Sequence, residues 1–245
     1  MKLIQISDCH LFASPEVSAY GDINPAQSLT SVLIAALKQQ PDGLLFTGDI
    51  SGDHSGASYQ LFLSLLNRWG GEIPWRVIPG NHDNNACFDQ TLKANWLQAD
   101  SPWILKGKYI HGLDTRLEGT LGMVDERQLA SVAASIATAP DAGHLLAIHH
   151  HPVATGSWMD NHALQNTVAL ARWLAEYPVK AVLHGHIHAD NQAQLSDTPV
   201  LGVPSSCWQW QLSSEFGLAS EKPGFRVIEW AEKGTFTSRI HRITQ

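Results

Sequence analysis

Cysteine is scarce in this sequence, and the three that occur, Cys9, Cys87 and Cys207, lie far apart along its 245 residues. A sparse, odd set of this kind argues against a scaffold held together by disulfide bonds. Positive charge is also scarce. The sequence has 16 lysine and arginine residues and 23 acidic residues, which gives a formal net charge of −7. Proteins that neutralise nucleic-acid phosphates are normally basic, so we expect no nucleic-acid partner.

Long apolar runs are missing as well. No stretch approaches the roughly 18 continuous apolar residues of a membrane span, and the first residues carry no signal-peptide pattern. We therefore expect a cytoplasmic protein with no membrane partner. Its composition, 44% hydrophobic and 16% charged, supplies ample material for a core and excludes a disordered chain. With no repeat or low-complexity linker, the sequence predicts one domain, residues 1–245.

Histidine is the residue that stands out by its distribution. Eight of the 13 histidines fall in four short segments, and each segment follows an apolar run. These segments hold His10, His82, His149 to His151, and His184, His186 and His188. Surface histidines would not cluster in this way, so the pattern favours metal chemistry.

The first three quarters of the chain alternate between strand and helix patterns. Apolar runs predict strands at 3–6, 44–46, 75–78, 109–113, 145–148 and 179–183, and helical spacing predicts helices near 24–39, 58–69, 129–136 and 164–174. Short apolar pieces at 199–203, 207–212, 225–230 and 235–243 then predict antiparallel β-strands in the C-terminal part of the chain. This order favours an α/β domain.

Five of the predicted strands end in polar motifs. They are Asp8-x-His10, Gly48-Asp49, Gly80-Asn81-His82-Asp83, His150-His151-Pro152 and Gly185-His186-x-His188. The carboxyl ends of strands form the ligand crevice of an α/β sheet, so these motifs would converge if the five strands share one sheet. Strand alternation would also place Asp8 and His10 on one side, where both can bind one ion.

The residue types in these motifs suit a pair of divalent metal ions. Imidazole, carboxylate and amide oxygen together favour manganese, iron, zinc or cobalt over calcium. A two-metal site also needs a group that bridges the ions, which a carboxylate can do and an imidazole rarely does. Glycines beside Asp49, Asn81 and His186 would let the backbone turn sharply and bring each ligand close.

In this order, the five motifs resemble those of the calcineurin-like metallophosphoesterase superfamily. Within it, the sequence is most similar to the bacterial class III 3′,5′-cyclic AMP phosphodiesterases. The finer resemblance is carried by Ile6-Ser7-Asp8-x-His10-Leu11-Phe12, Asp53-His54-Ser55 with Ser58-Tyr59, Gly156-Ser157-Trp158-x-Asp160, Pro204-Ser205-Ser206-Cys207 and Pro223-Gly224-Phe225-Arg226. The sequence departs from that pattern at Asp22-Ile23-Asn24, and at Trp208 and Trp210. Both departures could alter a substrate pocket.

The resemblance implies an α/β fold, α+β in some schemes. It is a four-layer α/β/β/α sandwich in which two mixed sheets are flanked by helices. The resemblance also implies two divalent ions, iron (Fe2+) or manganese (Mn2+), with cobalt (Co2+) and zinc (Zn2+) as alternatives. By this resemblance the first ion would bind Asp8, His10, Asp49 and His188, and the second Asp49, Asn81, His150 and His186.

The implied activity is that of a hydrolase acting on phosphoric diester bonds, converting 3′,5′-cyclic AMP to 5′-AMP by attack of a metal-bridging hydroxide. Asp49 would bridge the ions, His82 would donate a proton or stabilise charge, and Asp83 would orient His82. Asn81, His82, His188, Trp158 and His54 are the candidate substrate contacts.

Several alternatives stay open at this point. The same metal site could cleave glycerophosphodiesters, nucleotides or a lipid-linked diester, because substrate choice depends on the loops. The preferred base is open, and so is the choice between monomer and homodimer. A non-catalytic interaction scaffold fits less well, since the ligand set and His82 are intact.

Only one of the three adjacent histidines can be the main ligand. The resemblance favours His150, because the superfamily ligand lies two residues before a proline, here Pro152. His149 and His151 would then pack or orient other groups.

The remaining candidates concern the pocket and the core. Trp158, Trp208 and Trp210 could offer a flat apolar wall to an adenine base. His54, His111 and His162 are further pocket candidates, His184 and Cys9 are expected to be buried, and His144 and His241 to be solvated.

Overall fold

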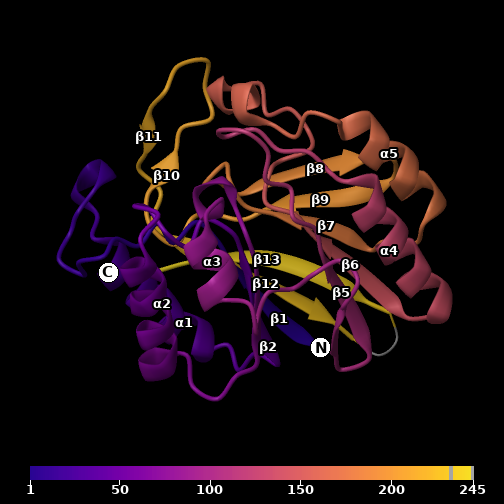
Figure 1. Cartoon of the computed structure of the whole chain (residues 1–245), viewed down its shortest axis with the longest axis horizontal. Helices are drawn as coiled ribbons and strands as arrows, with labels where there is room; N and C mark the ends of the chain where they lie inside the picture. Colours follow the sequence, from indigo (N-terminus) through magenta and orange to yellow (C-terminus); the bar gives the residue numbers. More distant parts are fainter. Residues whose placement is uncertain (232–233, 244–245) are drawn as a thin grey trace.

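The computed structural model describes residues 1–231 and 234–243, and its centre is a pair of β-sheets packed face to face (Figure 1). The first sheet has the order β13-β12-β1-β2-β3. Its strands are β1 (Lys2–Ile6), β2 (Gly43–Thr47), β3 (Trp75–Ile78), β12 (Gly224–Trp230) and β13 (Phe236–Arg242). β1, β2 and β3 are parallel to one another. β12 pairs antiparallel with β1, and β13 pairs antiparallel with β12.

The second sheet has the order β4-β5-β6-β7-β9-β8. Its strands are β4 (Trp103–Leu105), β5 (Lys108–Gly112), β6 (Gly143–Ala147), β7 (Ala181–His184), β8 (Asn191–Leu195) and β9 (Thr198–Gly202). The four inner strands are parallel, and the edge strands β4 and β8 are antiparallel to their neighbours. Both sheets are therefore mixed, as expected. A separate hairpin joins β10 (Gln209–Trp210) to β11 (Leu218–Ala219).

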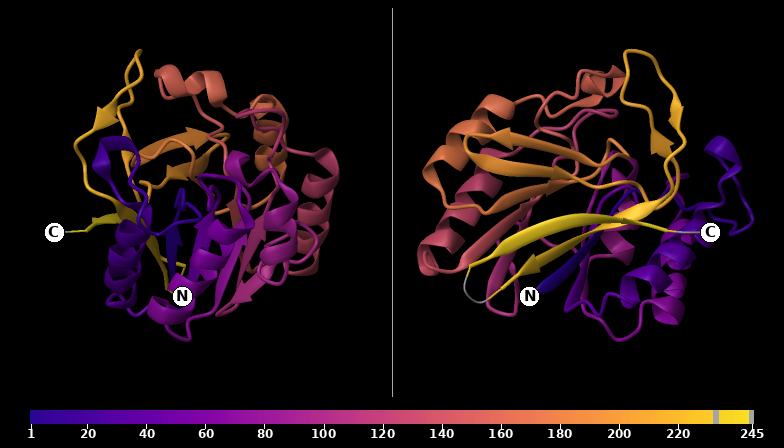
Figure 2. Two further views of the ribbon diagram at one scale, coloured as in Figure 1. Left: turned by 60° about the vertical axis from the view of Figure 1, so that its left-hand side comes forward. Right: turned by 180° about the vertical axis from the view of Figure 1, so that it is seen from behind.

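Helices cover the outer face of each sheet, on opposite sides of the molecule (Figure 2). The first sheet carries α1 (Pro25–Leu37) and α2 (Gly56–Trp69), and the second carries α4 (Glu126–Thr138) and α5 (Thr167–Glu176). The short α3 (Ala86–Thr91) packs beside α2. This confirms the four-layer α/β/β/α sandwich. Within the described residues, each helix is too short or too polar to span a bilayer.

The core between the two sheets explains why the strands look uniformly apolar in the sequence. Leu3, Leu45 and Ile78 of the first sheet pack against residues of the second, such as Leu145 and Leu183. The alternate side chains of the first sheet turn to α1 and α2 instead. Strands with both faces buried lose the polar alternation that marks a half-exposed strand.

The strands that carry the five motifs do not share one sheet. β1, β2 and β3 belong to the first sheet, and β6 and β7 to the second, so the condition given for convergence is not met. The motifs still converge, because the carboxyl ends of both parallel sets open at the same edge of the sandwich. The strands expected to form an antiparallel C-terminal segment are likewise divided: β9 lies in the second sheet, β10 in the separate hairpin, and β12 and β13 in the first sheet. The sequence patterns also missed β4, β8 and α3.

His111 and His144 form a buried pair on the adjacent strands β5 and β6. His111 Nε2 lies 3.0 Å from His144 Nδ1, and His144 Nε2 lies 3.0 Å from the carbonyl oxygen of Ala139. His144 therefore donates to Ala139 and accepts from His111. The prediction that His144 is solvated is wrong, because its side chain is fully buried. His111 is also fully buried and belongs to this pair rather than to a pocket.

Acid is expected to destabilise the protein through His111. Burial and the neighbouring His144 lower the pKa of His111 to about 4, whereas histidine in an unfolded chain has a pKa of about 6.5. Between these values the unfolded chain binds the extra proton, so the free energy of unfolding falls as pH falls through 6.5 toward 4. Between about pH 7.5 and pH 5, this group alone should lower that free energy by about 2 kcal/mol.

His111→Gln is the matched variant for this effect. Its amide keeps a hydrogen-bond donor near the position of Nε2 but does not titrate. Urea unfolding at both pH values should show a loss of stability about 2 kcal/mol smaller in the variant than in the wild type. Equal losses in the two proteins would contradict an origin at His111.

Candidate metal centre

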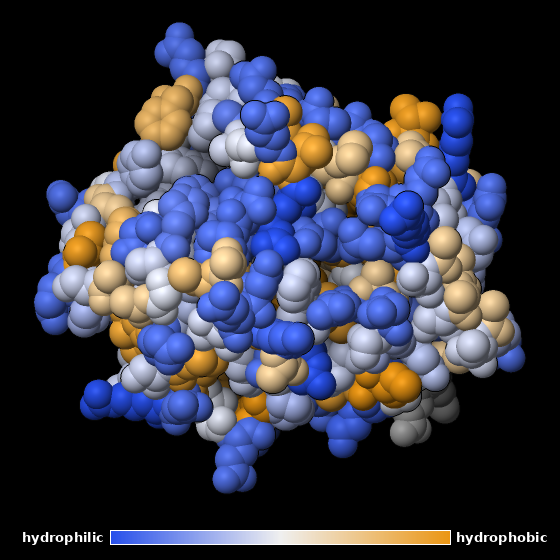
Figure 3. Space-filling view, viewed as in Figure 1, coloured by the Kyte–Doolittle hydropathy of each residue, from blue (hydrophilic) through white to orange (hydrophobic). Residues whose placement is uncertain are grey.

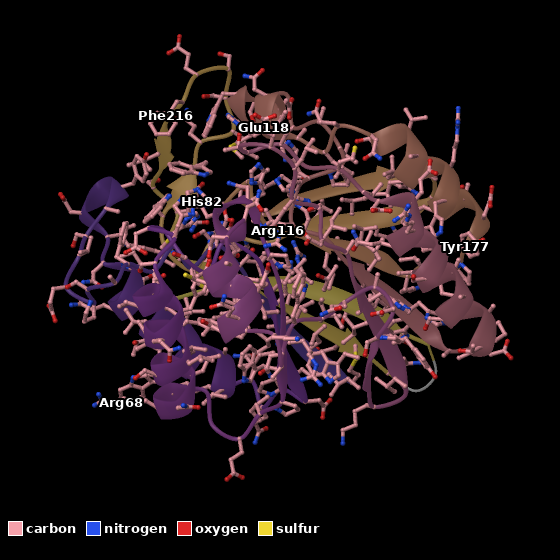
Figure 4. The ribbon with its side chains drawn as sticks, in the orientation of Figure 1. Arg68, His82, Arg116, Glu118, Tyr177 and Phe216 are labelled. Carbon is pink, nitrogen blue, oxygen red and sulfur yellow. The ribbon has the colours of Figure 1, made fainter. Side chains whose placement is uncertain are left out.

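The motif side chains gather into three overlapping groups at the carboxyl edge of the sheets. In each group, the possible ligand atoms lie within 4.8 Å of one another. The groups are Asp8 with His10 and His188, His10 with Asp49 and His82, and Asp49 with His149 and His186. His10 and Asp49 each belong to two groups, so the three form one continuous site. His82 lies to the upper left of the middle of the face seen in Figure 4, and the centre of that face is hydrophilic (Figure 3).

Short distances connect the first group. His10 Nε2 lies 3.0 Å from His188 Nε2, and His188 Nε2 lies 3.4 Å from Asp8 Oδ1. Asp49 Oδ2 is 3.8 Å from His10 Nε2. All four side chains are at most 5% exposed. Burial alone raises the pKa of Asp8, but the neighbouring His188 and His149 together outweigh it, and the pKa of Asp8 is lowered overall.

The backbone at these residues is held in an unusual conformation. Asp8, His10, Asp49, His186 and His188 have φ values of 55°, 44°, 53°, 72° and 48°. Non-glycine residues rarely adopt this left-handed region, and such strain gathers at functional sites, where the surrounding structure maintains it at a cost of about 1–3 kcal/mol each. The convergence of Asp8 and His10 therefore comes from left-handed turns beyond the end of β1, and the expectation based on strand alternation is wrong.

Two glycines allow the backbone to pack closely around Asp49. Gly48, just before it, has φ 96°. A Cβ atom on Gly80 would overlap Asp49 Oδ1 and would lie 2.5 Å from the Asp49 amide nitrogen. The segments that follow β2 and β3 can approach this closely only because Gly80 has no side chain. The predicted role of the glycines beside Asp49 and Asn81 is confirmed.

Three imidazoles are fixed in one tautomer by backbone carbonyl groups. His188 Nδ1 lies 2.9 Å from the Trp208 oxygen, and His149 Nδ1 lies 2.7 Å from the Thr47 oxygen. His186 uses its other nitrogen, Nε2, at 3.0 Å from the His162 oxygen. Each ring donates its proton to a carbonyl and so directs the lone pair of its remaining nitrogen toward the site. This arrangement is typical of metal-binding histidines.

The resulting set of atoms fits a cation. With its Nδ1 proton given to Thr47, neutral His149 aims the Nε2 lone pair at two oxygen acceptors, Asn81 Oδ1 at 3.2 Å and Asp49 Oδ2 at 3.4 Å. Acceptors facing acceptors repel each other unless a positive charge lies among them. Burial lowers the pKa of His149, but the Asp49 carboxylate outweighs it and raises the pKa to about 9. The site thus attracts a proton strongly when no metal ion supplies the charge.

His149 rather than His150 has a ring nitrogen in these groups, within the part of the chain that the structure describes. His150 Nδ1 lies 2.8 Å from Thr115 Oγ1, and His150 Nε2 is buried without a hydrogen-bond partner among the described residues. The His149 and His150 rings are edge to face, with centroids 5.0 Å apart. The third histidine, His151, instead places Nε2 3.4 Å from Asp160 Oδ1.

The Asp83 carboxylate is bonded to the backbone on both sides of the site. Its carboxylate accepts hydrogen bonds from the Gly80 and Ile50 amides, at 3.0 and 3.2 Å, and from the Tyr59 hydroxyl at 2.9 Å. Burial and the nearby Asp49 charge raise its pKa to about 6. These bonds tie the segments after β2 and β3 together. His82 Nδ1 has no hydrogen-bond partner among the described residues.

His82 is positioned by its backbone and by His54. The His82 amide donates to Asp49 Oδ1 at 2.8 Å, and His54 Nδ1 donates to the His82 carbonyl oxygen at 2.7 Å. The His54 and His82 rings are parallel within 3°, with centroids 5.4 Å apart. The sequence pattern correctly placed His54 beside the site, whereas His184 is buried at the end of β7.

Aromatic side chains surround the outer margin of the site. Trp208 stacks on His10, with centroids 5.1 Å apart, and Trp210 stacks on His188 at 4.9 Å. Trp158 contacts Trp210 at 5.7 Å, and its Nε1 donates to the Gln211 oxygen at 3.2 Å. Sequence reasoning missed Tyr20 and Phe216, which also contact Trp210. Tyr20 precedes the segment Asp22-Ile23-Asn24, so the two departures from the family pattern adjoin each other in space.

Comparisons with known proteins show to which family this chain belongs. The family model of the calcineurin-like phosphoesterases matches residues 1–190. The chain is 34% identical over 250 residues to the 3′,5′-cyclic adenosine monophosphate phosphodiesterase CpdA of Escherichia coli K12, covering 99% of this chain and 90% of that protein. It is 32% identical to a 3′,5′-cyclic-nucleotide phosphodiesterase of Nostoc sp., and the match covers 99% of this chain and 92% of that protein.

A solved structure with the same fold is that of a dimetal phosphatase from Danio rerio. The TM-score is 0.69 at 12% identity, covering 99% of this chain and 98% of that one, so the likeness concerns the fold. The family match covers more than half of the chain and includes all five motifs. The protein whose strand ends form this buried cluster of histidine and aspartate is a member of the calcineurin-like phosphoesterase family.

Proposed function

We propose that this protein is a metal-dependent phosphodiesterase that hydrolyses 3′,5′-cyclic AMP to 5′-AMP. The observation that carries the proposal is the buried set of carboxylates and imidazoles whose lone pairs face one another. Similarity over nearly the whole chain to proteins named as cyclic AMP phosphodiesterases supports this substrate. A small cyclic diester also suits a site that lies at the end of the strands rather than inside a closed cavity.

Two divalent ions, Fe2+ or Mn2+ first and Co2+ or Zn2+ otherwise, match these ligands. In the proposal, Asp8, His10, Asp49 and His188 hold the first ion. Asp49, Asn81 and His186 hold the second together with one histidine of the 149–151 segment, and the distances favour His149 over His150. When bound, the ions supply the positive charge that turns a water molecule into the attacking hydroxide and neutralises the phosphoryl oxygens.

His82 is the proposed proton donor to the leaving 3′-oxygen. One of its ring nitrogens lies within 4.8 Å of the possible ligand atoms of His10 and Asp49, yet the side chain is only half-buried. It can therefore reach a substrate that the buried ligands cannot contact directly. His54 and the Asp49 carboxylate hold the His82 backbone in place. As water attacks phosphorus and the bond to the 3′-oxygen breaks, the proton from His82 would neutralise that oxygen.

Removal of metal tests the proposal as a whole. The chelator-stripped protein is expected to leave 3′,5′-cyclic AMP intact, and addition of Mn2+ or Fe2+ should yield 5′-AMP, identified by chromatography. Because 3′-AMP would come from cleavage of the other ester bond, its appearance would overturn the proposed direction of attack. If a generic aryl phosphodiester is cleaved while cyclic AMP survives, the metal site stands and the substrate is wrong.

A further inference from the structure

Five aromatic side chains form a connected cluster at the outer margin of the metal centre. We call Tyr20, Trp158, Trp208, Trp210 and Phe216 the aromatic cluster. They come from three separate segments, the 3₁₀ turns Tyr20–Asp22 and Trp158–His162 and the β10–β11 hairpin with the residue before it. The hairpin and the Trp158–His162 turn stand side by side in Figure 1 and in both views of Figure 2.

The cluster is continuous with the candidate metal ligands. Trp210 stacks on the His188 ring, with the two planes inclined by 22°. The Phe216 ring follows Trp210 at 5.4 Å, and the Tyr20 ring contacts Trp210 at 5.1 Å. Two ring-to-ring steps therefore lead from a buried metal-site histidine to the molecular surface. Figure 4 shows Phe216 near the upper left margin of the molecule and His82 closer to its middle.

The outer rings of the cluster are exposed to an unusual degree. Phe216 is 57% exposed and Tyr20 is 50% exposed, and they are the only aromatic side chains among the exposed large hydrophobic residues of the described chain. Trp208, in contrast, is 4% exposed and packs against His10. Exposed aromatic rings gathered into one patch mark a site for a ligand, whereas scattered single ones need no explanation.

The segments that carry the rings are tied to one another. The Trp158 amide donates to the Ser213 oxygen at 2.8 Å, and its indole Nε1–H donates to the Gln211 oxygen. Gln211 in turn bonds to Gly217 across the hairpin, at 2.8 Å. These bonds hold the hairpin beside the Trp158 turn before any ligand arrives. A ring that is already in place loses little entropy when it binds a flat partner.

We propose that Phe216 and Tyr20 form the stacking surface for the nucleobase of the substrate, with Trp210 and Trp158 as their support. The inference rests on the proposed function, in which the phosphate lies at the metal centre. The base lies on the far side of the ribose from the phosphate, and the aromatic cluster leads outward from the phosphate site in the same way. An uncharged planar base matches rings that offer an apolar face, and stacking on aromatic rings is tolerant of base identity.

The test compares a substrate that has a base with one that lacks it. Trimethylene phosphate, the cyclic diester of 1,3-propanediol, has the same six-membered phosphodiester ring as cyclic AMP but no base or ribose. For Phe216→Ala, the ratio of kcat/KM for cyclic AMP to kcat/KM for trimethylene phosphate should fall about tenfold relative to the wild type. Phe216→Tyr should keep the ratio, while Phe216→Leu, which keeps apolar bulk without a flat ring, should lose most of it.

Ile104→Ala is the matched control, because Ile104 is 56% exposed on the distant strand β4 and its loss should not move the ratio. A second measurement does not depend on turnover. In Phe216→Ala and in Tyr20→Ala, we expect 5′-AMP to inhibit the enzyme more weakly than it inhibits the wild type. Inhibition by ribose 5-phosphate, which has no base, should be unchanged.

The outcomes separate the two proposals. If the wild type is active on cyclic AMP but Phe216→Ala leaves the ratio of kcat/KM values unchanged, the stacking surface is overturned and the proposed function stands. An equal loss with both substrates would do the same, since the ring would then support the whole site rather than the base. If the metal-loaded wild type makes no 5′-AMP from cyclic AMP, the proposed function fails and the stacking surface fails with it.

Discussion

Asp49→Asn is expected to lower turnover of cyclic AMP by at least about 10³-fold, the largest effect of any single substitution considered. Asp49 is 2% exposed and belongs to two of the three ligand groups, so it is the carboxylate that can serve both ions. Its Oδ2 lies 3.8 Å from His10 Nε2 and 3.4 Å from His149 Nε2. The asparagine amide has nearly the same shape but loses the negative charge, and one of its two positions becomes a donor.

The metal content of Asp49→Asn should fall together with activity. Because the folded shape is kept, its circular dichroism spectrum and thermal midpoint without metal give the control for correct folding. Asp141→Asn, at an exposed position after α4, is the matched charge-removing variant and should retain two ions and full activity. A fully active Asp49→Asn enzyme that still holds two ions would remove Asp49 from the centre of the site.

The sequence was informative about the secondary structure because burial leaves a clear pattern. β1, β2 and β7 have both faces covered, so each appears as a mostly apolar run. Helices α1, α2 and α4 have one buried face, which gives the 3.6-residue spacing. The assignment of strands to two sheets depends on long-range pairing, such as that of β12 with β1, and no local pattern encodes it. The resemblance to a family supplied that part.

The candidate site was predicted better in composition than in geometry. The sequence identified the motifs, but the left-handed backbone at Asp8 and His10 is a property of the turns beyond β1 and not of strand alternation. The choice among three adjacent histidines depends on which ring nitrogen meets Asp49, and spacing from Pro152 does not determine that. Phe216 gave no signal at all, because an aromatic residue in a polar loop becomes informative only when its neighbours in space are known.

His149→Ala and His150→Ala provide the second large test, since they remove equal side chains from neighbouring buried positions. Both leave a cavity and should cost similar stability, about 2–4 kcal/mol each. We expect His149→Ala to retain about one ion per chain instead of two and to lose about 10²- to 10³-fold in kcat. We expect His150→Ala to retain both ions and to lose about tenfold or less, because its ring contacts Thr115 and lies outside the ligand groups.

Metal analysis of the two purified variants, with kcat measured at saturating Mn2+, separates a ligand from a packing residue. The contacts of His149 give the reason for expecting the difference. Thr47 fixes its tautomer, so the lone pair of Nε2 faces Asn81 and Asp49, whereas the fully buried Nε2 of His150 has no described partner. The opposite result, an ion lost only in His150→Ala, would mean that this partnerless nitrogen turns to the metal when the ion binds. His149 would then hold Asp49 and Asn81 in place as a protonated, hydrogen-bonding group, consistent with its pKa raised to about 9.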